Sequence, residues 1–119
     1  MNLHKKKCIP CDGGTLPLNE KEIQEYLKQV NENWEISNDN KWLSRKFSFS
    51  AKDGSISKGK DPFKEVMLFV NKVADVANKE NHHPDMSVHY SKVVIKLTTH
   101  EIGGLSENDF IIAVKIDQF

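Results

Sequence analysis

The chain has 119 residues, enough for one domain with a single core and too few for two independent ones. Its 17 basic residues balance 17 acidic ones, so no bulk attraction to nucleic acid or to an anionic membrane is expected. The N-terminus lacks the apolar core of a secretory signal, and no stretch approaches the roughly 18 apolar residues of a membrane span. We therefore expect a cytoplasmic protein without a direct nucleic-acid or membrane partner.

Residues 1–18 are predicted to form a flexible N-terminal arm ahead of one domain spanning residues 19–119. Cys8 and Cys11 form a C-x-x-C pair, but outside the strand-to-helix context of a thioredoxin-like redox motif. A structural zinc would need two further ligands, of which His4 could supply one. A reduced arm is therefore favoured over a zinc site.

The first half of the domain predicts a helix followed by a β-hairpin. Asn19 with Glu22 indicates a helix start, and apolar residues recur with helical spacing to about residue 31. The segments 34–36 and 42–49 flank a turn-rich tetrapeptide and read as two strands. Residues 50–60 are polar and contain two glycines, which is typical of a surface loop.

The second half repeats this pattern and adds a final helix. Asp61-Pro62 supplies an N-cap and a first-turn proline for a helix that ends near Glu80. Alternating residues over 86–90 and 93–98 predict two strands, joined by a turn at residues 91–92. Ser106 with Asp109 predicts a capping box, and the helix behind it carries more apolar residues than one stripe requires, which favours a subunit interface.

The predicted order is αββαββα. For a single domain this order implies an α+β fold, with a four-stranded antiparallel sheet and helices packed on one face. No strand is followed by the glycine-rich phosphate turn of a nucleotide-binding fold.

Histidines are concentrated in the second half of the chain. Four of the five lie between residues 82 and 100, and His82-His83-Pro84 follows directly on the predicted helix end. His83 precedes a proline, so its backbone is pushed toward extended conformations and its side chain is expected to point away from that of His82. His100 follows a predicted strand, and several imidazoles near one cleft suit proton transfer at neutral pH.

Other interpretations of these residues remain open. The His-His-Pro corner could be a capping turn, and His100 a surface residue. Asp109 could serve only as the capping partner of Ser106 at the start of the last helix. His82, His100 and Asp109 are also acceptable zinc ligands, although their spacing matches no metal motif such as H-E-x-x-H.

Taken together, the order and gaps of these residues resemble the signature of the pterin-4a-carbinolamine dehydratase family. The matching residues are His82-His83-Pro84, Tyr90, Val93, Leu97, Thr99-His100, Gly103-Gly104-Leu105-Ser106 and Asp109. The Cys-Ile-Pro-Cys-x-Gly-Gly segment, Trp34 and Phe47-Ser48-Phe49 also resemble the opening of bacterial members. The resemblance thus covers almost the whole chain.

This resemblance implies the αββαββα fold, a homodimer or homotetramer, and the dehydration of a 4a-hydroxytetrahydropterin to a quinonoid dihydropterin. That reaction belongs to tetrahydrobiopterin recycling and needs no metal or organic cofactor. By resemblance, His82 and His100 are the acid and base, and His83 binds the substrate. Trp34, Pro84 and Asp109 are the residues that would bind the substrate or support the site. Asp109 would hold His100 or its loop. Trp34 would form an aromatic wall beside the pterin, unless it is only a core residue.

Two departures from the family pattern bear on the site. Asn78 stands where many members have a charged residue, so that position of the helix lacks a carboxylate. Glu80 could supply one instead, but it would face another direction on the helix. The loop at 50–60 is longer than in compact members. A non-catalytic dimerisation or assembly cofactor with the same fold, or a zinc protein, are the competing functions.

Overall fold

The computed structural model describes residues 2–10, 14–49 and 61–119. The loop predicted at 50–60 and Cys11 lie outside the described residues. The elements follow in the order η1 (Leu3–Lys5), α1 (Glu20–Leu27), β1 (Glu35–Ile36), β2 (Leu43–Ser48), α2 (Pro62–Glu80), β3 (Asp85–Val88), β4 (Lys92–Leu97), η3 (His100–Ile102) and α3 (Glu107–Ile116). Among these residues no helix is long and apolar enough to cross a membrane.

The four strands form one antiparallel sheet in the order β1-β2-β4-β3. Directly paired residues share a face, so Phe47 and Val93 lie beside each other, as do Met86 and Ile95. Val93, Ile95 and Leu97 are buried on this face, whereas the alternate positions carry polar residues such as Ser44, Lys46 and Lys96. The α+β fold and its two hairpins are confirmed.

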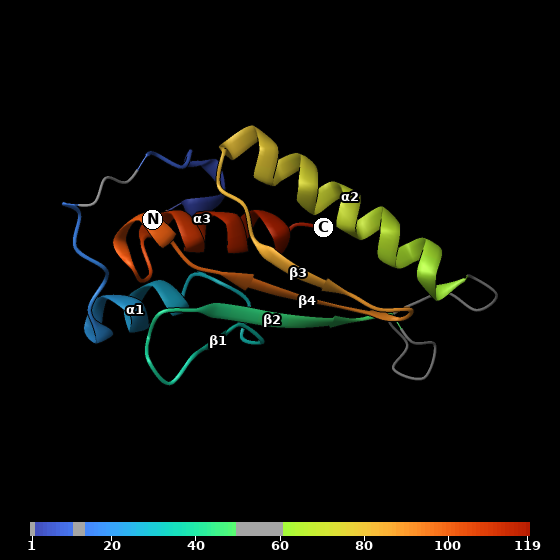
Figure 1. The fold of residues 1–119 in the computed structure, drawn as a ribbon, viewed down its shortest axis with the longest axis horizontal. Coiled ribbons are helices and arrows are strands. Elements are labelled where there is room, and N and C mark those ends of the chain that lie inside the picture. Colours follow the sequence, from blue (N-terminus) through green and yellow to red (C-terminus); the bar gives the residue numbers. More distant parts are fainter. Residues whose placement is uncertain (1, 11–13, 50–60) are drawn as a thin grey trace.

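Helices α2 and α3 lie on the same side of the strands (Figure 1). Helix α2 starts as predicted, with the Asp61 side chain accepting a hydrogen bond from Phe63 N and proline in the first turn, and it ends at Glu80. Helix α1 is shorter than predicted, because regular hydrogen bonding stops at Leu27. Val30 still packs against the core, since turns continue past the helix end, which explains why the apolar spacing extended further.

The apolar residues of α3 are buried within the chain itself. Eight of the ten α3 positions are buried, among them Phe110, Ile112 and Ile116. They pack against α2, η1 and α1, and the ring of Tyr26 stacks on that of Phe110 with centroids 5.1 Å apart. The interpretation of these apolar residues as a subunit interface is therefore wrong, because they are buried against three neighbouring elements of the same chain.

Residues 2–10 of the predicted arm pack against the domain. Leu3 is buried in the core, and its short helix η1 contacts α3. Further along, the backbone N–H groups of Cys8 and Ile9 donate to side chains of α2 and α3. The flexibility expected of residues 1–18 stays a prediction, but residues 2–10 have a docked position.

Candidate active site

The end of helix α2 positions His82. Asn81 adopts the left-handed conformation with φ of 53°, and the backbone N–H of His82 donates to Ala77 O at 3.2 Å. A left-handed residue with such a bond closes the helix and turns the chain away from its axis. Asparagine tolerates this conformation better than most side chains. The imidazole of His82 is thereby directed toward the start of α3.

His82 is hydrogen-bonded to a buried carboxylate. Its Nε2 lies 2.7 Å from Oδ1 of Asp109, and the two side chains are 11% and 0% exposed. A carboxylate in its ionised form can only accept, and opposite such a group Nε2 is the donor and Nδ1 is the nitrogen left for other partners. The pair fixes the orientation of the ring.

The second oxygen of Asp109 is held by the segment before α3. Oδ2 accepts hydrogen bonds from Thr99 Oγ1 at 2.8 Å and from Ser106 N at 3.0 Å. Thr99 Oγ1 also lies 2.7 Å from Ser106 Oγ. The predicted capping box is therefore confirmed, and its carboxylate has a second task. The resemblance implies that Asp109 holds His100 or its loop. Asp109 holds the loop through Thr99 and Ser106, and the histidine that it contacts is His82.

Two glycines allow Thr99 to reach Asp109. Thr99 pairs with Gly104 as an isolated bridge, and η3 turns between them through Gly103, whose φ is 69°. A Cβ on Gly104 would stand 2.8 Å from Cβ of Pro17, too close for a side chain. The Gly-Gly pair is thus explained by one left-handed turn and one close approach.

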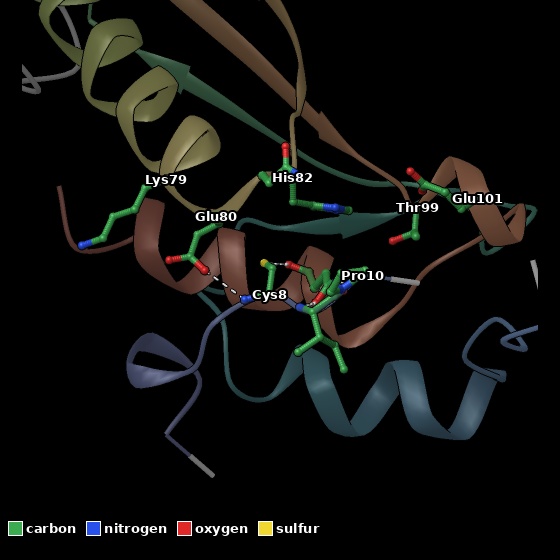
Figure 2. Close-up of a pocket in the computed structure, with 10 residues that line it drawn as sticks. Cys8, Pro10, Lys79, Glu80, His82, Thr99 and Glu101 are labelled. Carbon is green, nitrogen blue, oxygen red and sulfur yellow. Dashed lines mark hydrogen bonds between the residues drawn. The ribbon is translucent and has the colours of Figure 1, made fainter. Parts of the chain in front are cut away.

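A cavity of about 360 Å³ opens beside His82. It is lined by the end of α2, by Thr99 and Glu101, by Asn108 and by residues 8–10 of the arm. Figure 2 shows the His82 imidazole pointing from the end of α2 toward Thr99, with Cys8 and Pro10 across from it. A volume of this size suits a small heterocyclic ligand.

The other two histidines are placed differently. His83 is exposed, and its Nε2 lies 3.1 Å from Oδ1 of Asn78. His100 is exposed in η3, and its ring meets that of Trp42 edge to face with centroids 5.8 Å apart. His82 lines the cavity and these two do not. His82 and His83 therefore have different partners, as expected from the extended backbone of the residue before Pro84.

Trp34 lies in the core. Its side chain is buried, its Nε1 donates to Asp117 Oδ1 at 2.8 Å, and its ring packs edge to face on Phe47. These contacts correspond to the core interpretation, and a role toward a ligand stays a prediction. Pro84 is half-buried directly before β3 and separates the histidines from that strand.

Metal ligands are not gathered in the part of the chain that the structure describes. No group of three or more His, Cys, Asp and Glu side chains there is placed to hold a metal ion. The zinc set of His82, His100 and Asp109 is accordingly not assembled, since His100 faces Trp42 while His82 faces Asp109.

Several residues near His82 are not evident from the sequence. Thr99 joins the capping box to the histidine, Glu80 binds the backbone of the arm, and Asn108 lines the cavity. Thr99 belongs to the matching signature beside His100, but the signature assigns it no role. Asn108 and Glu80 carry no such signal, because their roles depend on where a segment about 100 or 72 residues away lies.

Comparison with known proteins gives a consistent result. The model of a family described as pterin 4 alpha carbinolamine dehydratase matches residues 16–119. Two relatives carry names that propose them as pterin-4-alpha-carbinolamine dehydratases. The one from Alkaliphilus metalliredigens is 44% identical over 98% of this chain and 95% of its own length. The one from Nitrosomonas eutropha is 45% identical over 98% and 91%.

A solved structure shares the fold. The crystal structure of a transcriptional coactivator/pterin dehydratase from Brucella melitensis superimposes with a TM-score of 0.72 and 26% sequence identity. The match covers 86% of this chain and 96% of that one.

Proposed function

The chain belongs to the pterin-4a-carbinolamine dehydratase family, and we propose that it removes water from a 4a-hydroxytetrahydropterin by histidine acid–base catalysis beside Asp109. The observation that carries the proposal is the contact between His82 and the fully buried Asp109 at the edge of a cavity. Membership of the family supports the choice of reaction, and the contact with Asp109 supports His82 as a proton-transfer group.

The reaction requires little beyond proton transfer. The N5 nitrogen of the carbinolamine supplies the electron pair that forms the N5–C4a double bond, while the C4a–oxygen bond breaks. The leaving hydroxide takes a proton from an acid and departs as water, and a base takes the proton from N5. The enzyme therefore has to provide an acid, a base and a slot that holds a flat bicyclic ring.

In this proposal His82 exchanges a proton with the substrate through the nitrogen that does not face Asp109. The carboxylate keeps the ring in one orientation and stabilises the positive charge that the ring carries when it is doubly protonated. His100 is the second proton-transfer group, and His83 binds and orients the pterin. Since both are exposed, we propose that they contact the substrate from the rim, with Pro84 fixing the chain between His83 and β3.

The test is turnover of freshly generated 4a-hydroxytetrahydropterin, followed by stopped-flow absorbance. The native protein should accelerate dehydration, and His82→Ala should lower kcat by about 10²–10⁴-fold, the usual contribution of a positioned acid or base. His100→Ala should lower kcat as well, whereas His83→Ala should act chiefly on KM.

His89→Ala is the matched control. His89 is an exposed histidine in the turn between β3 and β4, so its replacement should leave kcat and KM unchanged. A native protein that leaves the dehydration rate as it is in buffer would refute the proposed function. Full activity of His82→Ala would refute the role of that residue.

The wider setting belongs to the same proposal. We place the reaction in tetrahydrobiopterin recycling, in the cytoplasm, with a homodimer or homotetramer as the active species. A cell-free extract that regenerates tetrahydrobiopterin for an aromatic amino acid hydroxylase should slow when the protein is removed. Recovery on adding the native chain, but not His82→Ala, is the expected result.

A second candidate function is that of a dimerisation or assembly cofactor. The Brucella melitensis neighbour carries both a coactivator and a dehydratase name, which favours considering it. The double variant His82→Ala/His100→Ala separates the two functions, because it should abolish turnover and preserve any complex with a partner protein. A native chain that binds a partner but never turns over a pterin would favour the cofactor role.

A further inference from the structure

The N-terminal arm forms one side of the cavity beside His82. Cys8, Ile9 and Pro10 line it, opposite the end of α2 (Figure 2). The family model begins at residue 16, so these residues lie outside the segment that it matches. We propose that the docked arm, held by Asn108 and Glu80, is a binding wall for the pterin and sets its affinity. This inference rests on the proposed function.

The side-chain amide of Asn108 pairs with the backbone of the arm, in the way that a peptide group of a neighbouring β-strand pairs with a strand. Its Oδ1 accepts a hydrogen bond from Ile9 N at 3.0 Å, and its Nδ2 donates to Ile9 O at 2.6 Å. Both polar ends of one buried side chain thus contact the backbone of a single arm residue. Because the amide group is rigid, this pairing fixes the position of the arm and also its direction.

Glu80 provides the second attachment. Its side chain is 5% exposed, and Oε1 accepts from Cys8 N at 2.9 Å. Lys115 stands 3.9 Å from Oε2 and donates to His4 O at 2.8 Å, so the buried carboxylate has a cationic neighbour that also contacts the arm. Buried Leu3 anchors the beginning of the arm in the core.

The last turn of α2 and the first turn of α3 each hold both sides of the cavity. Asn108 holds the arm and its neighbour Asp109 holds His82, while Glu80 holds the arm two residues before His82 itself. A molecule in the cavity is therefore bounded by the proton-transfer group on one side and by the arm on the other. The Cys8 thiol, the one titratable side chain among residues 8–10, is directed to Asn108 O at 3.7 Å. In this arrangement the arm contributes surface and no proton transfer, so it should stabilise the ground state and the transition state alike.

Uniform stabilisation of this kind changes KM and leaves kcat in place. Asn108→Asp is the first test: it keeps the acceptor for Ile9 N, turns a carboxylate oxygen toward Ile9 O, and adds a negative charge in the first turn of α3, where helices tolerate it. KM should rise about tenfold, as expected for the loss of a well-made polar contact, with kcat within about twofold of the native value.

Cys8→Pro is the second test, because it removes the N–H that Glu80 accepts and alters neither helix. It is compared with Cys8→Ala, which also lacks the thiol but keeps the N–H. The proline variant should have the higher KM of the two. Lys6→Ala is the control: its Nζ contacts Glu107 at an exposed site outside the cavity, so KM and kcat should stay native.

The experiment measures KM and kcat for all four variants, Ile9 amide exchange by NMR, and the Kd of a 7,8-dihydropterin, which cannot undergo the dehydration. Faster Ile9 exchange with raised KM and Kd in Asn108→Asp and Cys8→Pro is the expected result. Unchanged KM and Kd in both variants would overturn the binding wall. If the native chain shows no turnover but the two variants still bind the dihydropterin more weakly than it does, the dehydration is refuted and the binding wall is supported.

Discussion

At the scale of single residues, Asp109 connects the local structure of α3 to the proposed chemistry. One oxygen completes the capping box and receives Thr99, and the other holds His82. A carboxylate with no exposed surface depends on such partners, because burial without hydrogen bonds is costly. The residue therefore serves stability and orientation together.

Asp109→Asn tests both tasks. The amide has one acceptor oxygen and brings an NH₂ donor against groups that are themselves donors, so a buried polar atom loses its partner. We expect the free energy of unfolding to fall by about 1–3 kcal/mol and kcat to fall by about 10²-fold or more. Urea denaturation and stopped-flow kinetics measure the two effects; a native kcat in a stably folded variant would contradict the role of Asp109 in orienting His82.

Tyr26 provides a prediction about pH. Burial, and then the hydrogen bond from its hydroxyl to Glu107 at 2.8 Å, raise the pKa of Tyr26 from 10.0 to about 12. The unfolded chain thus releases this proton first, so the stabilisation is complete below about pH 10 and is lost as the pH rises toward 12. Tyr26→Phe should remove this component. The measurement is urea unfolding at about pH 9 and about pH 11: the native chain should lose more stability between them than the variant, and equal losses would contradict the assignment.

At the scale of elements, short connections place the site more than the regular helices and strands do. The left-handed Asn81 ends α2 and directs His82, and the turn through Gly103-Gly104 returns β4 toward α3. Each connection depends on a residue that tolerates an unusual backbone or a close contact. These are the positions where a small substitution should have a large effect.

Gly104→Ala should lower the free energy of unfolding by about 1–3 kcal/mol, because the added Cβ would collide with Pro17. Pro17→Gly removes the opposing atoms, so the double variant should recover part of the loss. Thermal or urea unfolding of the two single variants and the double variant gives the coupling energy. Strictly additive effects would show that the cost has another origin.

At the scale of the whole molecule, α3 is enclosed by the chain rather than left for a partner. Exposed apolar side chains remain on α2, where Phe63 and Leu68 are 43% and 59% exposed. Association into a homodimer or homotetramer stays a prediction. Sedimentation equilibrium should give two or four times the 13.6 kDa of one chain. A single-chain mass across the concentration range would contradict it.

The fold could be predicted from the sequence because its signals are local. Capping residues such as Asp61 and Ser106 act within one helical turn, and apolar alternation acts within one strand, so element order and sheet type follow without knowing the packing. The end of α1 was misplaced for the same reason: Val30 continues the apolar spacing in a turn that no longer has helical hydrogen bonds.

Local sequence signals are sufficient to predict the αββαββα order, the capping box at Ser106 and Asp109, and the family to which the chain belongs. The contact of Asp109 with His82, the enclosure of α3 and the position of residues 8–10 beside the cavity emerge only in the folded chain. These facts depend on contacts between segments far apart in the chain. Such contacts follow from how whole elements pack, and a periodicity or a spacing carries no record of them.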